Sequence, residues 1–434
     1  NKVSQGANQE VEDTDTIIKN REDTASSNTV TIEAEKKDDK VEVTLKDVNI
    51  DTSSRNKAAV SVTGSGNTTI KLDGDNHLTG GNGSSGISSS GSLTITGGET
   101  DSLTAKGGSG EDGGDGIFSK DLTISGGTVT ATGGGSTGSD RPCGYGIFST
   151  NTTTISGGTV TATGGDSTGS YSSGGYGIYS SGVTISGGTV TANGGSGKDG
   201  SGDGIFSFDP VAISGGTVTA KGGSGEDGED GGDGIRSFDP VAISGGTVTA
   251  KGGSGEDGSG GRGIISTKSV TISGGTVNAN GGSGKNGNGG SGIIGSGRVA
   301  VSGGTVNAAG GDGGNGKDGG DGIYSSDIDL SGSLELTAKA GSPNGKALSQ
   351  KGSELVLDTI KDKLGPGAKV TATDADGKVI DQVPTPRPVE PEGPVIPEES
   401  SSSSDGGSAT PSAPASPLPG LTVTDKSGAV IDSI

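Results

Sequence analysis

The chain has 434 residues, of which 93 are glycine, and 53 acidic against 31 basic residues give a formal net charge of −22. Contacts to nucleic-acid phosphates require clustered lysine and arginine, which the sequence lacks, so the charge argues against a nucleic-acid partner. No apolar run approaches the roughly 20 residues of a membrane helix, so we expect no membrane insertion. A hydrophobic content of 26% would by itself suggest disorder, but the repeats described below outweigh it.

The N-terminal part of the chain changes character at Thr29. Residues 1–28 hold several closely spaced acids and little apolar content, which predicts a disordered acidic leader. From Thr29 apolar and polar residues alternate, first in Thr-Val-Thr-Ile-Glu-Ala and then in Val-Glu-Val-Thr-Leu-Lys-Asp-Val-Asn-Ile. We interpret this stretch as the irregular N-terminal cap of a domain that spans residues 29–381.

The centre of the chain repeats one pattern, in which Gly-Ile and a bulky residue precede a short apolar run, Ile-Ser-Gly-Gly-Thr-Val-Thr-Ala and a glycine-rich loop. A near-constant period of this kind is typical of a solenoid, whose coils bury apolar residues by stacking. We therefore predict an all-β parallel β-helix of about 10 to 11 coils, with three short strands per coil and glycine-rich loops at one corner. One anchor position recurs 28 to 31 residues apart, at Ile95, Ile124, Ile155, Ile185, Ile213, Ile243, Ile272, Val301 and Leu330.

Alternation places two columns of aliphatic residues inside the coils and leaves the residue after each inward isoleucine on the outer face. The predicted inward columns run through Ile87 to Ile323 and through Val129 to Val306. The outer positions contain four consecutive aromatic residues, with two tyrosines nearby. These rings could stack on the sugar rings of a polysaccharide, or they could form a side core beneath an overhanging loop. The candidate ligand-binding residues are Phe118, Phe148, Tyr179, Phe206, Tyr145 and Tyr176.

The glycine-rich loops are acidic, and equivalent acids of neighbouring coils should stand about 5 Å apart. Repulsion between such acids could be offset by calcium, which prefers flexible, oxygen-rich loops. The alternative interpretation is that these acids are solvated and keep a repetitive protein soluble. The candidate metal ligands are Asp203, Glu226, Asp227, Glu229, Asp230 and Asp233.

The sequence offers little support for a set of catalytic residues, so we predict no enzymatic activity. The single histidine, His77, lies near the cap, and the serines of Ile-Ser-Gly-Gly have no histidine base. A calcium-dependent polysaccharide lyase would need an arginine base, for which Arg236 or Arg262 beside Asp233 are the candidates. The single cysteine, Cys143, cannot form an internal disulfide and is interpreted as an incidental thiol.

The C-terminal part of the chain is a spacer followed by a new β-like segment. Residues 382–420 contain ten prolines and five consecutive serines, which predicts an extended linker. Residues 421–434 alternate again and predict the truncated start of a further β module.

The segments Val-Thr-Leu-Lys-Asp-Val-Asn-Ile at 43–50, Thr-Ile-Lys-Leu-Asp-Gly-Asp-Asn-His-Leu-Thr-Gly-Gly at 69–81 and Ser-Leu-Thr-Ile-Thr-Gly-Gly at 92–98 carry a family resemblance. Together with the repeat array, they resemble the secreted carbohydrate-binding-domain proteins of anaerobic Gram-positive bacteria. The resemblance covers residues 29–340 and implies a right-handed parallel β-helix akin to polysaccharide lyases, in which some members bind calcium and acidic plant polysaccharide without cleaving it. The longer acidic loops of this chain depart from the family pattern.

We therefore expect a monomeric protein, secreted or attached to the cell surface, that binds a polysaccharide or a cell-surface glycan without catalysis. An acidic polysaccharide would require bridging calcium in so acidic a chain, whereas a neutral glycan would use the aromatic residues. Two alternatives stay open: a purely structural surface stalk, and a polysaccharide lyase.

Overall fold

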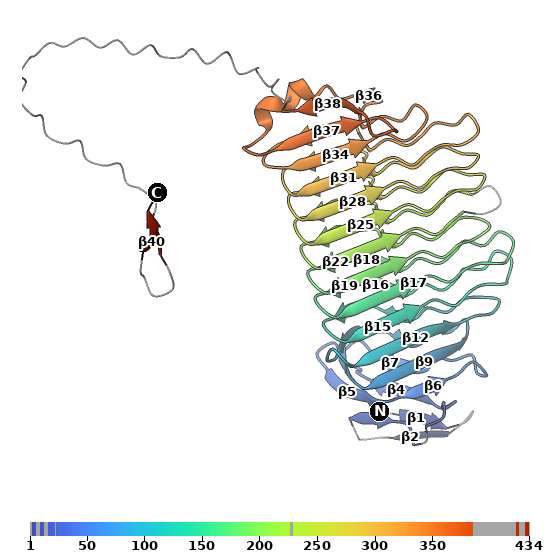
Figure 1. Ribbon diagram of the computed structural model, residues 1–434. Helices are drawn as coiled ribbons and strands as arrows, with labels where there is room; N and C mark the ends of the chain where they lie inside the picture. The colour runs from blue at the N-terminus through green and yellow to red at the C-terminus, as the bar shows by residue number, and fades with distance from the viewer. Residues whose placement is uncertain are drawn as a thin grey trace, which may run out of the picture. The chain divides into compact units, whose positions relative to one another are not determined.

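The computed structural model describes residues 2–5, 9–12, 16–21, 23–225 and 229–384, together with two strands at 422–424 and 430–433. The chain divides into two units, Asn1–Pro386 and Arg387–Ile434. The first unit is a parallel β-helix of about eleven turns, which confirms the predicted fold class (Figure 1). In the second unit, β39 (Thr422–Thr424) pairs antiparallel with β40 (Val430–Ser433). Most of the predicted linker lies outside the described residues.

Each regular coil contributes three strands, as predicted, because the alternating segments are short and are separated by glycine corners. The first and second strands belong to one 25-stranded sheet, and the third belongs to a 13-stranded sheet. In two coils the first and second strands are continuous, in β16 (Ile147–Ile155) and β18 (Ile178–Ile185).

The strand bounds show how regularly the coils repeat. The other first strands are β4 (Thr29–Glu33), β7 (Val60–Thr63), β10 (Ile87–Ser89), β13 (Ile117–Ser119), β20 (Ile205–Ser207), β23 (Ile235–Ser237), β26 (Ile264–Ser266), β29 (Ile293–Gly295), β32 (Ile323–Ser325) and β35 (Leu348–Gln350). The other second strands are β3 (Ile17–Lys19), β5 (Lys40–Lys46), β8 (Asn67–Asp73), β11 (Ser92–Thr96), β14 (Asp121–Ile124), β21 (Val211–Ile213), β24 (Val241–Ile243), β27 (Ser269–Ile272), β30 (Arg298–Val301) and β33 (Ile328–Leu330). The third strands are β6 (Asn49–Asp51), β9 (Asp75–Asn82), β12 (Ser102–Gly108), β15 (Thr128–Thr132), β17 (Thr159–Thr163), β19 (Thr189–Asn193), β22 (Thr217–Lys221), β25 (Thr247–Lys251), β28 (Thr276–Asn280), β31 (Thr305–Ala309), β34 (Glu335–Lys339) and β37 (Lys369–Thr373).

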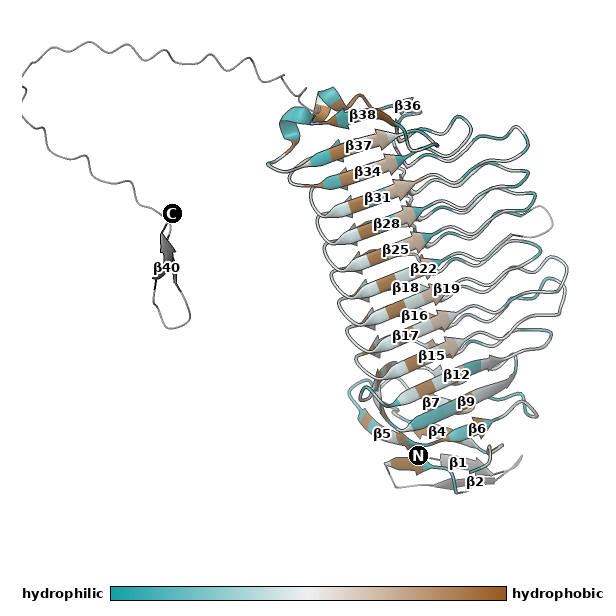
Figure 2. Ribbon diagram, in the orientation of Figure 1, coloured by the Kyte–Doolittle hydropathy of each residue, from teal (hydrophilic) through white to brown (hydrophobic). Residues whose placement is uncertain are grey.

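The core is a set of aliphatic columns that run along the β-helix axis. Ile117 pairs in register with Ile147, and Val129 pairs with Val160, so that identical side chains stack from coil to coil. All members of both predicted inward columns are fully buried, and the apolar residues recur at the same place in successive strands (Figure 2). Burying one such side chain stabilises the fold by roughly 1.5 to 3 kcal/mol, and the continuous stack adds these small contributions.

The turn from the second to the third strand depends on its second glycine. Gly127, Gly158 and their equivalents have φ between +77° and +81°, a backbone region that other residues rarely adopt. A Cβ on Gly158 would also lie 2.5 Å from the carbonyl oxygen of Gly127 in the preceding coil. Both the backbone angle and the close approach therefore require glycine in Ile-Ser-Gly-Gly.

The long loops have their own hydrogen-bonded layer at their base. Each loop leaves the third strand through an outgoing leg and returns to the next first strand through a returning leg. The amide of an outgoing glycine donates to a returning glycine of the preceding loop, as in Gly223 N to Gly202 O at 2.8 Å. The returning glycine then donates to its own outgoing leg, as in Gly232 N to Gly223 O at 2.9 Å. This chain of hydrogen bonds continues without a break from Gly108 to Gly341, and we call it the glycine layer.

The ends of the β-helix are closed by irregular elements. At the N-terminal end, β1 (Lys2–Gln5) pairs antiparallel with both β2 (Gln9–Glu12) and β4, and β3 pairs parallel with β5. The expected disordered leader is therefore wrong for these strands, because their backbone groups extend the sheet and Ile18 is buried. At the C-terminal end lie β36 (Ser353–Glu354), the 3-10 helix η1 (Leu357–Lys363) and β38 (Val379–Val383), which pairs antiparallel with β37. Among the described residues, no helix has the length and apolar character needed to cross a membrane.

Candidate functional site

The outer face of the first strands carries one column of side chains that changes character along the rod. The register pairs Thr31 with Ser61 and Ser61 with Ser88, and Ser88 precedes Phe118 in the same column. We call this set the outer column. It consists of Thr31, Ser61, Ser88, Phe118, Phe148, Tyr179, Phe206, Arg236, Ile265, Ile294, Tyr324 and Ser349.

A second column lies three residues upstream, on the returning legs of the loops. Backbone hydrogen bonds tie neighbouring members together, as in Gly116 N to Tyr145 O at 2.9 Å. Side chains of this second column touch those of the outer column at Tyr145 with Phe148 and at Asp233 with Arg236. We call it the leg column, and it consists of Ser85, Asp115, Tyr145, Tyr176, Asp203, Asp233, Arg262, Ser291, Asp321 and Lys346.

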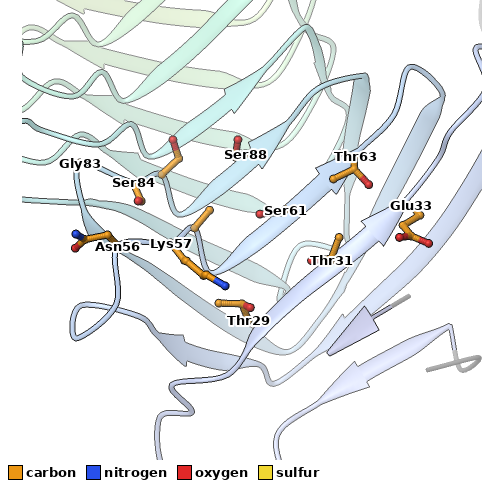
Figure 3. A pocket seen from close by; sticks show the side chains of 12 residues that line it. Thr29, Thr31, Glu33, Asn56, Lys57, Ser61, Thr63, Gly83, Ser84 and Ser88 are labelled. Carbon is orange, nitrogen blue, oxygen red and sulfur yellow. The ribbon is translucent and has the colours of Figure 1, made fainter. Parts of the chain in front are cut away.

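Small polar residues in both columns leave a hollow of about 690 Å³ over the first coils. Thr31, Ser61 and Ser88 lie on successive strands along it, and Asn56 and Lys57 lie at its margin (Figure 3). Phe118 occupies the next position of the outer column after Ser88, one strand beyond the residues that line the hollow. The remaining lining residues are Thr29, Glu33, Ala58, Thr63, Gly83, Ser84 and Ser85. This hollow was not predicted, because a run of serine and threonine gives no signal distinct from any solvated strand face.

The structure brings all six predicted aromatic residues into one cluster and packs them against each other. Tyr179 stacks on Phe206 at 5.1 Å between ring centroids and on Tyr145 at 4.9 Å. Tyr176 stacks on Phe206 at 4.9 Å, and Phe206 is buried. Ring faces that contact each other are not open to a sugar, so the side-core alternative fits these residues better than a continuous platform, although the cover comes from other rings. Phe118 contacts only one ring within the described chain, the edge-on Phe148 at 5.1 Å.

Two exposed rings at the edge of this cluster were not predicted. Phe208 and Phe238 are 44% and 43% exposed, and they stack on each other at 5.7 Å. The available signal was the repeated Ser-Phe-Asp-Pro at 207–210 and 237–240, which places both phenylalanines just after a buried serine.

Two of the predicted metal ligands form a buried ion-pair cluster instead. Arg236 Nε lies 2.7 Å from Asp233 Oδ2 and 3.6 Å from Asp203 Oδ2. Asp203 Oδ1 accepts a hydrogen bond from Asp233 N at 2.6 Å, and Asp203 Oδ2 accepts none. Burial, together with the charge of Asp233, raises the pKa of Asp203. Asp203 and Asp233, which were expected to bind calcium, therefore lie at the base of the loops and face arginine.

The other candidate metal ligands do not complete a site. Glu226 and Asp227 lie outside the described residues. Asp230 Oδ1 accepts a hydrogen bond from Ser259 N at 2.6 Å, so one oxygen of this acid already serves a loop contact. Within the described ranges, no group of three or more histidine, cysteine, aspartate or glutamate side chains could hold a metal ion.

The surroundings of Arg236 and Cys143 do not favour the reactive form of either side chain. Burial lowers the pKa of Arg236, but the charges of Asp203 and Asp233 more than offset this effect and raise it above its ordinary value. A lyase base would need the opposite shift. Cys143 is buried, and burial raises the pKa of its thiol, which disfavours the nucleophilic thiolate.

Asp115, in the leg column, leads to a prediction about pH. Burial raises its pKa to about 7, against the opposing effect of a hydrogen bond from Tyr145 N at 2.8 Å. The unfolded chain releases this proton near the ordinary value of 3.8, so stability falls as pH rises from about 4 to about 7. Titration of Asp115 should lower the free energy of unfolding by on the order of 3 kcal/mol between pH 4.5 and pH 8. We expect Asp115→Asn to abolish this contribution. Denaturant midpoints of both proteins at the two pH values measure this, and parallel pH curves would contradict it.

A comparison of the amino-acid sequence with known families supports the β-helix fold independently of the structure. Six segments match the family model described as a β-helix repeat. The array is similar to known β-helix repeats. Such repeats fit a surface or carbohydrate-related protein in general. The searches of curated proteins and of solved structures found no match. The matched segments are residues 122–147, 154–178, 183–205, 211–235, 241–264 and 270–293.

Proposed function

We propose that this protein is a non-catalytic glycan-binding protein, and that the hollow over the first coils holds the glycan. The observation that carries the proposal is the change within the outer column from Thr31, Ser61 and Ser88 to Phe118. Hydroxyl side chains can exchange hydrogen bonds with sugar hydroxyls, and an aromatic ring at the end can pack on the apolar face of a sugar. The combination of an open polar hollow and one terminal ring suits a short stretch of a linear polysaccharide.

The charges of the hollow favour a neutral glycan. Among the described residues, Lys57 and Glu33 are the only charged ones that line the hollow, and they have opposite signs. An anionic glycan would meet no excess of positive charge in this hollow, because one lysine and one glutamate line it. The proposal includes no calcium, because Asp203 and Asp233 neutralise Arg236 and lie in later coils.

The same lining gives no support for cleavage. Glycoside hydrolysis uses two carboxyl groups on either side of the scissile bond, whereas the described part of the chain contributes one acid, Glu33, to the lining. We propose binding alone, by a protein that is secreted or attached to the cell surface, as the family resemblance implies.

Filling the hollow tests the proposal. Ser61→Phe together with Ser88→Phe extends the outer column with the residue that later coils already carry at the same register, so we expect the β-helix to fold. We expect glycan binding, first identified on an array of neutral and acidic polysaccharides and then measured by calorimetry, to weaken at least tenfold. The control is Ile294→Phe, which adds a ring to the same column far from the hollow. Equal binding by both variants would contradict the site, and an added chelator should change nothing.

A structural spacer is the second candidate function, and the glycine layer favours it. Hydrogen bonds from Gly108 to Gly341 link every loop base to its neighbours and stiffen the rod along its length. If the intact protein binds no glycan on the array, with or without calcium, the spacer is the function that stands.

A further inference from the structure

A second hollow, of about 440 Å³, lies on the other side of the loops, where the third strands pass into the outgoing legs. Its floor consists of consecutive glycines such as Gly252 and Gly253, and a Cβ on Gly253 would lie 1.8 Å from the carbonyl oxygen of Gly223. The floor therefore cannot carry side chains, and the hollow is a fixed feature of the glycine layer. Its rims are the last residues of β22, β25 and β34 on one side and the loop serines Ser224, Ser254 and Ser283 on the other.

The strand rim of this hollow is basic. Lys221 and Lys251 pair in register on adjacent strands, and Lys339 lies three coils further along the same column. All three side chains are exposed, and none forms an ion pair with a residue that the structure describes. Elsewhere, lysines such as Lys46, Lys71 and Lys285 each contact a carboxylate of an adjacent coil.

An unneutralised lysine pair is unfavourable by itself. Adjacent strands lie about 4.8 Å apart, and two ammonium groups at that separation would repel each other by roughly 1 kcal/mol in water. In a chain with 53 acidic residues, the described lining around Lys221 and Lys251 consists of serine hydroxyls and backbone groups. The one acid among the described lining residues, Asp312, lies towards Lys339. Asp312 Oδ1 accepts a hydrogen bond from Ser342 N at 2.9 Å.

We propose that this hollow is a second binding site, for a linear glycan that carries anionic groups, held by Lys221 and Lys251 with Ser224 and Ser254 as hydrogen-bond donors. Either a carboxylate or a sulfate group on an extended glycan fits this site, because a lysine ammonium binds both as a point charge. The bound glycan lies along the axis of the β-helix, so Lys339 contacts an anionic group further along the same polymer. The site does not depend on the neutral-glycan hollow, which lies over the first coils.

The test uses the full chain with polygalacturonate, dextran sulfate and uncharged dextran as probes. We expect binding of one or both anionic polymers at low salt, and none of dextran. The double variant Lys221→Gln/Lys251→Gln should weaken this binding at least tenfold and reduce its salt dependence, because exposed charges are screened by salt. The carboxylate and sulfate arms tell which anionic group the site prefers.

The control is Lys106→Gln/Lys120→Gln, which removes the same charge; Lys106 occupies the same column on β12, away from the hollow. Unchanged melting temperatures show that both variants are folded. Equal weakening in both variants would mean that only net charge matters, and it would overturn the site, as would anionic-polymer binding that survives Lys221→Gln/Lys251→Gln. Binding of neutral glycans in the first hollow should be the same in all three proteins, so either proposal can fail without the other.

Discussion

Gly232→Ala is expected to destabilise the β-helix by about 3 to 5 kcal/mol, through overpacking and lost backbone hydrogen bonds. A Cβ on Gly232 would lie 2.0 Å from the carbonyl oxygen of Gly202 and 2.8 Å from its carbonyl carbon. Neither atom can rotate away, because both belong to the backbone. The displaced leg would lose the bond that Gly232 N donates to Gly223 O and the bond that Gly232 O accepts from Gly253 N.

The effect should be local as well as large, because a solenoid coil contacts only its neighbours. Denaturant unfolding measures the total loss, and amide hydrogen exchange should show new opening in the coils around residues 202–261 while distant coils keep their protection. The control is Gly182→Ala, whose nearest contact would be Thr152 Cγ2 at 3.6 Å, an ordinary van der Waals distance. If the two variants are equally stable, the glycine layer does not hold the loops.

Arg236→Leu should be the next most damaging single change, at about 3 kcal/mol near pH 8, because it leaves two buried carboxyl groups beside one remaining cation. Asp203 and Asp233 are 2% and 0% exposed. Among the described residues, the carboxylate of Asp233 would keep its contacts with Arg262, from the backbone N at 2.7 Å and from Nη1 at 3.6 Å. Adding Asp203→Asn to Arg236→Leu should recover much of the loss, because it removes one of the buried acids.

The pH dependence of the Arg236→Leu variant gives a second measurement. At acid pH Asp203 can take up a proton, so the loss should be smaller at pH 5 than at pH 8. Arg298→Leu is the matched control: Arg298 also contacts two acids, Asp327 and Asp329, but at the surface, where ion pairs contribute less than about 1 kcal/mol. Thermal midpoints of the three proteins at both pH values decide the comparison. Equal losses in Arg236→Leu and Arg298→Leu would mean that the buried cluster contributes no more than a surface pair.

The near-identical repeats at 203–228 and 233–258 show how one substitution acquires meaning in the fold. They differ at Phe206 and Arg236, which sit next to each other in the outer column. Phe206 ends the stacked rings, and Arg236 neutralises the acids of its own coil and of the preceding one. The sequence of the repeat indicated a duplicated coil. The replacement of phenylalanine by arginine could not be interpreted without knowing which acids are buried beside Arg236.

The surroundings of Asp203 and Asp233 could not be predicted from the sequence for a related reason. In sequence they belong to the same acidic, glycine-rich loops as Asp230. In space, each loop narrows into hydrogen-bonded legs, and a residue two positions before the inward isoleucine is already at the base, against the outer column. Loop composition does not show where the legs close, so solvated and buried acids look alike in the sequence.

The sequence by itself determined the stacking of this protein, because a period of 28 to 31 residues and strict alternation place identical aliphatic residues one above another. It also determined which strand positions face outward, including those of Phe118, Phe148, Tyr179 and Phe206. Only the tertiary structure decided what those outward residues do. Small side chains leave a hollow at Ser61 and Ser88, rings cover one another at Tyr179 and Phe206, and lysines stand over a floor of glycine. The physical reason is that inward register depends on the pattern within one coil, whereas an outer surface depends on contacts between side chains of different coils and loops.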